Sequence, residues 1–211
     1  MAFGPSLLDA TDTLPARSDV ITVARPHLTL GVSMNAPYPD DTETAYVGMG
    51  CFWGAERKFY ETPGVYVTSV GYQGGVTANP SYQDVCTGRT NHTEVVKVVF
   101  RPSELSFEGV LKVFFENHDP TQGFRQGGDI GTQYRSAIYF TSDAQRETGE
   151  RMVAEFQLRL NEAGYGTITT EVAPAGPFYS AEEYHQQYLT ANPNGYCGLG
   201  GTGVSCPIGV L

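Results

Sequence analysis

The chain has 211 residues, 40% of them hydrophobic, 12% aromatic and 17% charged, and it carries a formal net charge of −10 at pH 7. This length suits one large domain, and the supply of apolar residues excludes a chain that is disordered throughout. An acidic surface repels phosphates, which argues against nucleic acid or an anionic membrane as the main partner.

The first forty residues contain five prolines and show no sustained hydrophobic period. Residues 1–40 are therefore predicted to form an irregular arm that wraps on the domain. The start of the chain has neither the basic nor the apolar region of a secretory signal, and no apolar run approaches the ~18 residues of a membrane span. We therefore expect a cytoplasmic protein that does not bind membranes.

Regular structure is predicted from residue 41 to residue 194, the segment that we expect to form the catalytic domain. Apolar and β-branched runs indicate strands, and a capping residue or a 3.6-residue period indicates helices. In chain order, the first half is predicted to contain a strand at 45–49, a helix at 52–61, a strand at 65–72, a short helix from 81 and a strand at 94–100.

The second half continues the alternation of helices and strands. In chain order, it is predicted to contain a helix around 107–114, a Gly-rich loop at 119–133, a strand at 136–140, a long helix behind a Ser142–Gln145 capping box, a strand at 168–172 and a helix from a Ser180–Glu183 capping box to about 192. The alternation favours a two-layer α+β sandwich around one core. Residues 195–211 are a Gly-rich tail, predicted to be too pliable for regular structure.

The strongest candidate site is Gly50-Cys51-Phe52-Trp53-Gly54, which follows a predicted strand and opens a predicted helix. The unpaired N–H groups and the dipole at a helix N-terminus stabilise a thiolate, so the pKa of Cys51 is expected to fall below the free value of ~8.5. A buried, inert cysteine among core aromatic residues is the alternative interpretation of this pattern.

The other cysteines are Cys86, Cys197 and Cys206, which are too few for a disulfide scaffold. The sequence contains no C-x-x-C pair and its four histidines are scattered, so no structural zinc site is expected. Cys86, with apolar neighbours, is interpreted as a small buried hydrophobe. Cys197 and Cys206 lie nine residues apart on the tail, where they are either a pair for thiol–disulfide exchange or two chance surface cysteines.

Four polar residues in the loops and in one strand are further candidates: Tyr82, Glu94, Asp129 and Tyr134. Glu94 heads an apolar strand, where desolvation is expected to raise the pKa of its carboxyl group, and a neutral carboxyl can donate a hydrogen bond. Each of these residues taken singly is also compatible with a surface or capping role. Only their convergence on Cys51 would decide between the two.

Several blocks of the sequence together resemble the A-type peptide methionine sulfoxide reductase family. They are GCFWGAERKFYETPGV, SVGYQGGVTANPSYQDVCTGRTNHTEVVKVVF, FFENHDPTQ, GDIGTQYRSAIY, ITTEVAPAGPFYSAEEYHQQYL and NPNGYCG. The resemblance covers residues 45–201. It implies a ferredoxin-like core with a mixed sheet, a monomer, and the reduction of the S epimer of methionine sulfoxide, free or in proteins, as an oxidative-stress repair activity.

The resemblance also implies a role for each candidate residue. Cys51 would be the nucleophile, Phe52 and Trp53 the apolar pocket for the S-methyl group, and Cys197 the resolving thiol. The sulfoxide oxygen would accept hydrogen bonds from Glu94, Tyr82 and Tyr134. Asp129 would line the site and order its polar contacts. Cys206 resembles a second recycling cysteine that passes the disulfide to thioredoxin or a similar dithiol. This chemistry requires no metal or organic cofactor.

Two other classes of function are considered for the same residues. A cysteine hydrolase or acyl-transferase would use Cys51 as nucleophile and His185 as base, and it would have no use for the tail cysteines. His185 could equally be a hydrogen-bonding structural residue. A non-catalytic module that binds apolar peptides through Phe52, Trp53 and the many tyrosines would leave Cys51 with an ordinary pKa.

Overall fold

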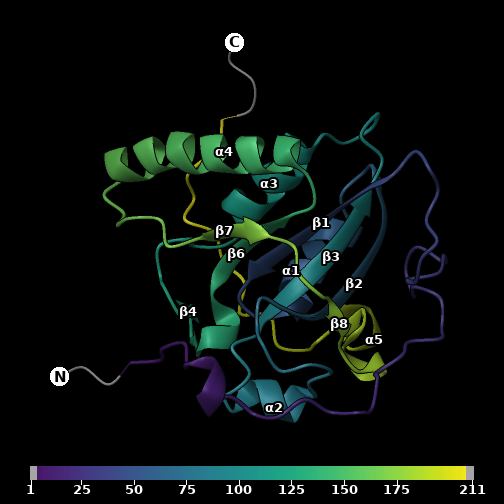
Figure 1. Cartoon of the computed structure of the whole chain (residues 1–211). Helices are drawn as coiled ribbons and strands as arrows, with labels where there is room; N and C mark the ends of the chain where they lie inside the picture. The colour runs from purple at the N-terminus through teal and green to yellow at the C-terminus, as the bar shows by residue number, and fades with distance from the viewer. Residues whose placement is uncertain (1–3, 208–211) are drawn as a thin grey trace.

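The computed structural model describes residues 4–207 of the chain. Its centre is a six-stranded sheet with the strand order β7-β6-β1-β3-β2-β8 (Figure 1). Neighbouring strands are antiparallel except β6 and β7, which are parallel, so the sheet is mixed. The strands are β1 (Glu43–Met49), β2 (Val65–Gln73), β3 (Thr93–Phe100), β6 (Ser136–Phe140), β7 (Glu171–Pro174) and β8 (Tyr179–Ser180).

The helices and the short elements lie between and after these strands. The α-helices of the described residues are α1 (Phe52–Tyr60), α2 (Tyr82–Cys86), α3 (Phe107–Asn117), α4 (Asp143–Glu162) and α5 (Tyr188–Ala191). Single 3-10 turns are η1 (Ala10–Asp12), η2 (Thr132–Tyr134) and η3 (Glu183–His185), and β4 (Arg125–Gln126) pairs with β5 (Asp129–Ile130) in a small ribbon.

The four inner strands and two of the helices repeat one unit twice. β1-α1-β2 and β3-α3-β6 each consist of a strand, a helix and a parallel strand, and the two units interlock in the order β6-β1-β3-β2. This is the split β-α-β topology of the ferredoxin-like fold. The predicted α+β class with a mixed sheet is therefore confirmed.

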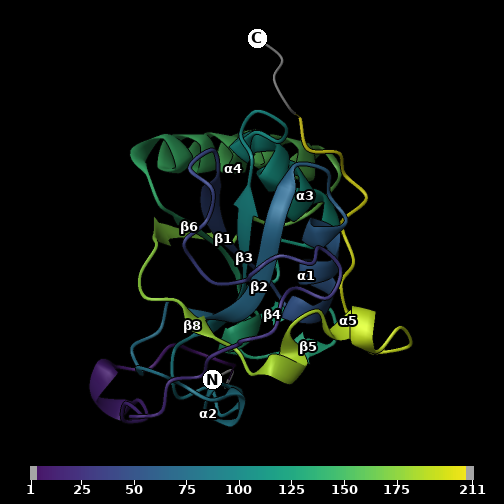
Figure 2. The same cartoon turned by 90° about the vertical axis from the view of Figure 1, so that its right-hand side faces the viewer.

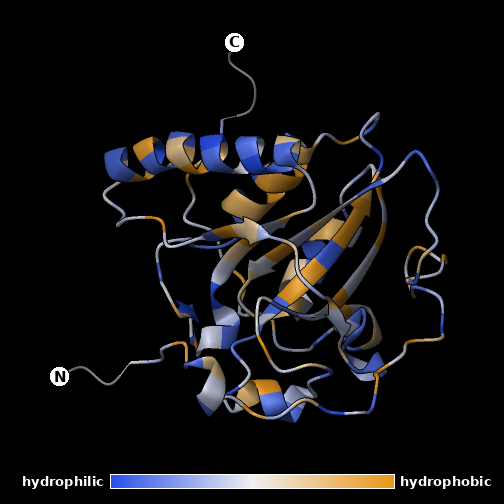
Figure 3. Ribbon diagram, in the orientation of Figure 1, coloured by the Kyte–Doolittle hydropathy of each residue, from blue (hydrophilic) through white to orange (hydrophobic). Residues whose placement is uncertain are grey.

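Helices α1, α3 and α4 cover one face of this sheet (Figures 1 and 2). Alternate strand residues such as Val47, Val98 and Ile138 belong to one buried cluster with Phe59 of α1 and Phe156 of α4. The cluster is formed by every second residue of the strands and by the helix residues that recur about every 3.6 positions. Figure 3 shows the result: apolar residues lie along β3 and α3, whereas polar and apolar residues alternate along the outer helix α4.

The N-terminal arm covers part of the opposite face, where it crosses in front of β2 in Figure 2. Val23 and Met34 of the arm pack against Val67 of β2 and Val99 of β3. Apart from η1, the described part of the arm has no helix or strand before Glu43. Residues 1–3 of the arm and residues 208–211 of the tail lie outside the described residues.

The helix predicted from Ser180 to about residue 192 is wrong. Ser180 instead pairs with Gly71 in β8, and the chain then forms η3 and α5 as separate short elements. Gln187, between them, adopts a left-handed φ of 49°, which ends any continuous helix. The side chain of Gln186 bonds both the N–H and the carbonyl of Val70, so long-range contacts replace the local helical bonds.

Two other predicted boundaries also differ from the structure. The strand predicted at 168–172 is β7, which begins at Glu171 because the N–H of Ile168 is bonded to the Gln157 side chain and that of Thr169 to the Pro120 carbonyl. The loop predicted at 119–133 contains the β4–β5 ribbon. The other predicted strands and helices are present within a few residues of their expected ends.

Within residues 4–207, no helix combines the length and the apolar character needed to cross a bilayer.

Candidate active site

Cys51 lies where the chain leaves β1 and enters α1. Gly50 turns the chain with a φ of 88°, and a Cβ at this position would stand 2.5 Å from the Cβ of Gln126, so only glycine fits. Cys51 is the N-cap residue of α1, with its thiol at the end of the helix that carries unpaired N–H groups. The strand–turn–helix context predicted for Cys51 is therefore present.

Glu94 is brought to the same helix end by the sheet. Val96 of β3 lies opposite Val47 of β1, and the same register continued by two residues sets Glu94 beside Met49. Its Oε2 accepts a hydrogen bond of 3.0 Å from the backbone N–H of Phe52. The pKa of Glu94 is raised to about 8, chiefly by burial; the Phe52 N–H opposes the shift and the charge of Asp129 adds to it. As expected for a desolvated carboxyl, Glu94 keeps its proton at neutral pH.

A pocket of about 140 Å³ opens beside the two groups. Seven of the predicted site residues line it, from α1, α2, β3, β5 and η2; they are Cys51, Phe52, Trp53, Tyr82, Glu94, Asp129 and Tyr134. The convergence on Cys51 that the sequence left open is thus present in the structure. Tyr196 of the tail also lines the pocket, and the sequence interpretation missed it.

Two phenols of the pocket, those of Tyr82 and Tyr134, remain protonated at physiological pH. Burial raises the pKa of Tyr82 and of Tyr134 above the ordinary value of 10, and the charge of Glu94 contributes to both shifts. Three neutral hydroxyl donors therefore face one small space, two from the phenols and one from the Glu94 carboxyl. Such a set fits an acceptor that carries partial negative charge.

The expectation that Cys51 has a lowered pKa is wrong. Burial raises the pKa of the thiol, and the negative charge of Glu94 adds to the effect. The N–H of Trp53 lowers it in part, although no side-chain hydrogen bond caps the helix. Desolvation outweighs the helix end because the pocket removes water from the sulfur. The repulsion by Glu94 exists only while that carboxyl is ionised.

Trp53 is held by two side chains from the segment that follows β8. The ring of Tyr188 stacks on its face with centroids 3.8 Å apart, and the ring of His185 lies at its edge with centroids 5.7 Å apart. The indole N–H of Trp53 donates a hydrogen bond of 3.0 Å to Nδ1 of His185. This clamp fixes the plane of the indole that forms one wall of the pocket.

His185 is unsuited to be a base for Cys51. Its Nδ1 already accepts the indole N–H of Trp53, and its Nε2 lies 3.9 Å from Oε2 of Glu182. It is absent from the residues that line the Cys51 pocket. Burial lowers the pKa of His185 to about 4, so the ring is a neutral structural group. The hydrolase interpretation therefore loses its base.

The tail brings Cys197 to the first turn of α1. A Cβ on Gly54 would stand 2.8 Å from the Sγ of Cys197 and 3.0 Å from the Cβ of Leu199, so the second glycine of GCFWG makes room for the tail. The hydroxyl of Tyr196 donates to both carboxylate oxygens of Asp129 at 3.3 Å. An aromatic residue next to a candidate resolving cysteine was the available signal for Tyr196.

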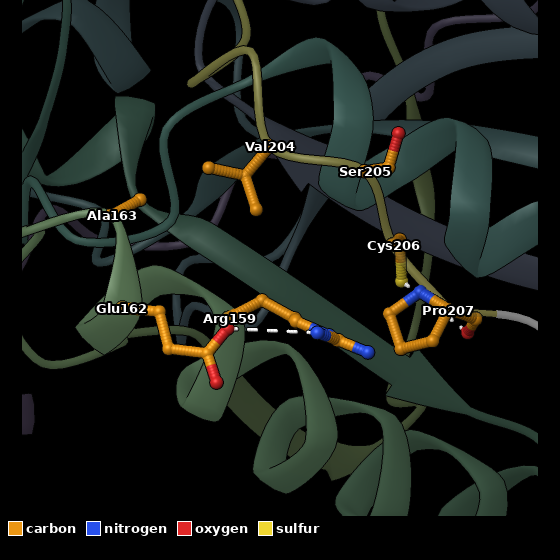
Figure 4. A pocket seen from close by; sticks show the side chains of 7 residues that line it. All are labelled: Arg159, Glu162, Ala163, Val204, Ser205, Cys206 and Pro207. Carbon is orange, nitrogen blue, oxygen red and sulfur yellow. Dashed lines mark hydrogen bonds and ion pairs between the residues drawn. The ribbon is translucent and has the colours of Figure 1, made fainter.

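Cys206 belongs to a different part of the molecule. It is buried among the main core residues, and its N–H donates to the Glu116 side chain of α3 at 3.0 Å. Figure 4 shows it in a second pocket with Arg159 and Glu162 of α4, where Val204 and Ser205 precede it in the tail. The described part of the tail has no helix or strand, as predicted, but it is docked along α1, α3 and α4 (Figure 2).

Cys86 is exposed, which contradicts its interpretation as a buried hydrophobe. It ends α2, a helix of five residues whose only buried member is Val85. The apolar neighbour in the sequence faces the core, and the thiol beside it faces outward because successive residues of a helix point in different directions. All four cysteines carry free thiols in the structure.

Comparison with known proteins gives consistent matches over nearly the whole chain. A family model described as peptide methionine sulfoxide reductase matches residues 43–202. The peptide methionine sulfoxide reductase MsrA 1 of Caulobacter vibrioides is 61% identical over 201 residues, which are 95% of this chain and 93% of that protein. The human mitochondrial peptide methionine sulfoxide reductase is 55% identical, over 97% of this chain and 87% of its own length.

Solved structures agree with these sequence matches. Methionine sulfoxide reductase A of Corynebacterium diphtheriae superposes with a TM-score of 0.86 at 48% identity, over 92% of this chain and 94% of its own. Mxr1 of Saccharomyces cerevisiae in its reduced form superposes with a TM-score of 0.71 at 34% identity, over 76% of this chain and 91% of its own.

Proposed function

The chain belongs to the peptide methionine sulfoxide reductase family and reduces methionine S-sulfoxide to methionine, and we propose that Cys51 is the nucleophile of this reaction. The activity repairs oxidised proteins. One observation supports the assignment above all others: the thiol of Cys51 shares a small pocket with the buried carboxyl of Glu94, and both are fixed to the same helix end. The roles below rest on that pocket.

The substrate is held by its oxygen and by its methyl group. The neutral carboxyl of Glu94 and the hydroxyls of Tyr82 and Tyr134 donate hydrogen bonds to the sulfoxide oxygen. Phe52 and Trp53 contact the S-methyl group and exclude water from it. A thioether lacks the oxygen acceptor and would leave these buried donors unpaired, which favours binding of a sulfoxide.

The first chemical step transfers the oxygen from the substrate to the enzyme. Glu94 gives its proton to the sulfoxide oxygen, which makes the substrate sulfur electrophilic. The thiol proton of Cys51 passes to the Glu94 carboxylate and restores the acid. The Cys51 sulfur attacks the activated substrate sulfur, the bond between that sulfur and its oxygen breaks, and the hydroxyl group is transferred to the Cys51 sulfur. The products are methionine, reduced by two electrons, and Cys51 sulfenic acid, oxidised by two electrons.

The second step converts the sulfenic acid of Cys51 into a disulfide that a dithiol can reduce. The Cys197 thiol attacks the sulfenic acid, a Cys51–Cys197 disulfide forms and water leaves. Asp129 orders this region through its bonds with Tyr196. Cys206 then exchanges with the disulfide and carries it to the surface, where thioredoxin or a similar dithiol reduces it. Because Cys206 is docked between α3 and α4, this exchange requires the tail to leave that site.

The organisation of the chain follows from these roles. We assign residues 41–194 to a single catalytic domain, residues 1–40 to its arm and residues 195–211 to a redox tail. Four free thiols fit a reducing compartment, so we place the protein in the cytoplasm as a monomer. Free and protein-bound methionine sulfoxide are both substrates in this proposal.

A test of the nucleophile uses the exposed cysteine as a matched control. The Cys51→Ser variant is expected to lose reduction of methionine S-sulfoxide with dithiothreitol as donor, and Cys86→Ser is expected to keep it. Mass spectrometry of the wild type after one equivalent of substrate should find a Cys51–Cys197 bond. Full turnover by Cys51→Ser would refute the proposal.

A further inference from the structure

One buried polar cluster has no part in the proposed chemistry. Its centre is Glu56, which is fully buried on α1 one helical turn after Trp53. Three hydrogen bonds end on its carboxylate: 2.7 Å from the backbone N–H of Gln187, 2.7 Å from the side-chain amide of Gln187 and 3.0 Å from the hydroxyl of Thr68. A buried carboxylate is costly unless donors saturate it, and here each donor is in place.

The N-terminal arm supplies the second layer of this cluster. The guanidinium of Arg25 donates to Oε1 of Gln187 at 2.9 Å and to the backbone carbonyl of Gln186 at 2.7 Å. It also lies 3.6 Å from the carboxylate of Glu183. One arginine of the arm thus holds three residues of the segment that follows β8, Glu183, Gln186 and Gln187.

His27 of the arm reaches the same carboxylate through Thr68. Its Nδ1 accepts two backbone N–H groups, so the ring proton is on Nε2, which lies 2.9 Å from the Thr68 hydroxyl oxygen. His27 therefore donates to Thr68, and Thr68 donates to Glu56. These two consecutive hydrogen bonds fix the orientation of the His27 ring and of the Thr68 hydroxyl.

Gln187, which this cluster holds, lies between the two residues that clamp the indole. It has a left-handed φ of 49°, which a residue without this support would adopt at a cost. His185 lies two residues before it and Tyr188 directly after it. Both contact the Trp53 ring: His185 accepts its N–H at the edge, with centroids 5.7 Å apart, and Tyr188 stacks on its face, with centroids 3.8 Å apart.

We propose that Glu56 is a positioning residue for the methyl-binding wall of the active site, and that Arg25 of the N-terminal arm supports it. The cluster fixes the left-handed backbone conformation of Gln187. That conformation determines the positions of the His185 and Tyr188 rings, which hold the indole of Trp53. The inference rests on the proposed role of Trp53 in substrate binding. It gives the otherwise unassigned N-terminal arm a function in the reaction.

The test uses Trp53 itself as the probe because it is the only tryptophan of the chain. Glu56→Gln keeps the shape of the side chain but replaces one acceptor oxygen with an amide that cannot accept a hydrogen bond. We expect acrylamide to quench Trp53 fluorescence about twofold more effectively, and the KM for methionine sulfoxide to rise about fivefold with little change in kcat. Glu61→Gln, at the exposed end of α1, should change neither quantity.

The arm variant keeps the test decisive if Glu56→Gln does not fold. Arg25→Ala removes the outer support without burying a new group, and it is expected to shift fluorescence quenching and KM in the same direction by a smaller factor. Arg146→Ala on α4 is its matched control. Folded Glu56→Gln and Arg25→Ala proteins with wild-type quenching and KM would overturn the inference.

The fluorescence measurement needs no turnover. The two proposals therefore fail in different ways. If the proposed function is wrong, Cys51→Ser keeps sulfoxide reduction, whatever the quenching in the Glu56 and Arg25 variants. If the Glu56 proposal is wrong, folded Glu56→Gln and Arg25→Ala keep wild-type quenching and KM, whatever Cys51→Ser does.

Discussion

The backbone N–H of Phe52 donates a hydrogen bond to the buried carboxyl of Glu94. Phe52 directly follows Cys51, so this bond ties the proposed acid to the residue next to the proposed nucleophile. The acid sits on the central strand β3 and the nucleophile on the helix that packs against it. The bond therefore holds the carboxyl of Glu94 at the helix end that carries Cys51, which pre-positions the two groups for reaction.

The pH dependence of the reaction should report the proton on Glu94. Because the pKa of this carboxyl is raised to about 8, the acid form is present below pH 8 and is lost above it. We expect kcat/KM for methionine sulfoxide to fall as pH rises through about 8. In Glu94→Gln the activity should be lower by about 10²–10⁴-fold and should lack this descending limb. A limb of unchanged position in the variant would exclude Glu94 as its source.

Stability should depend on pH through the same carboxyl. The folded-state pKa of Glu94 lies above its ordinary value of 4.5, so its stabilising contribution is complete below pH 4.5 and disappears as pH rises through about 8. Each unit of pKa shift is equivalent to about 1.4 kcal/mol. Glu94→Gln is therefore expected to unfold at higher urea concentration than the wild type at pH 9, and the advantage should vanish near pH 4. Equal midpoints at pH 9 would contradict the raised pKa.

Gly54→Ala should separate the two chemical steps. A methyl group at this position would lie 2.8 Å from the Sγ of Cys197 and would push the tail away from α1. We expect the first methionine to form at the wild-type rate in a single turnover, and the Cys51–Cys197 disulfide to form roughly tenfold more slowly, as expected for a misplaced reacting group. Thiol counting against time measures both rates.

The matched control for Gly54→Ala is Gly149→Ala on α4. A methyl group there would meet its nearest neighbour at 3.7 Å, which is an ordinary contact. Disulfide formation in this variant should match the wild type. If Gly54→Ala also formed the disulfide at the wild-type rate, close packing of the tail on α1 would have no part in the second step.

The docking of the tail should protect Cys206 from thiol reagents. Cys86 and Cys197 are exposed and Cys206 is buried, so a maleimide should label Cys206 last among these three. Glu116→Ala removes the side chain that accepts the Cys206 N–H, and it should speed the labelling of Cys206 several-fold without affecting Cys86. Peptide mapping by mass spectrometry measures each rate, and labelling of Cys206 as fast as Cys86 in the wild type would argue against a docked tail.

Local pattern was sufficient for most of the secondary structure. The run Ala45–Met49 and the helix behind Cys51 could be predicted because strand alternation and helix entry are properties of neighbouring residues. The helix-entry cysteine of GCFWG indicated thiol chemistry, whereas its oxygen-binding partners came from the resemblance to the reductase family. The same local reasoning failed at Ser180, where pairing with Gly71 of β2, more than a hundred residues earlier, overrides a capping pattern.

Only the tertiary structure decided how the candidate groups act on one another. The sequence predicted a lowered pKa for Cys51 from its helix end, but the folded pocket desolvates the sulfur and sets Glu94 beside it, so the pKa is raised. It also predicted a buried Cys86, which is exposed, and did not predict the burial of Cys206, because exposure depends on which surfaces meet. Residue order along the chain fixes the local conformation and the chemical repertoire, whereas burial and the distances between remote side chains are properties of the packed whole.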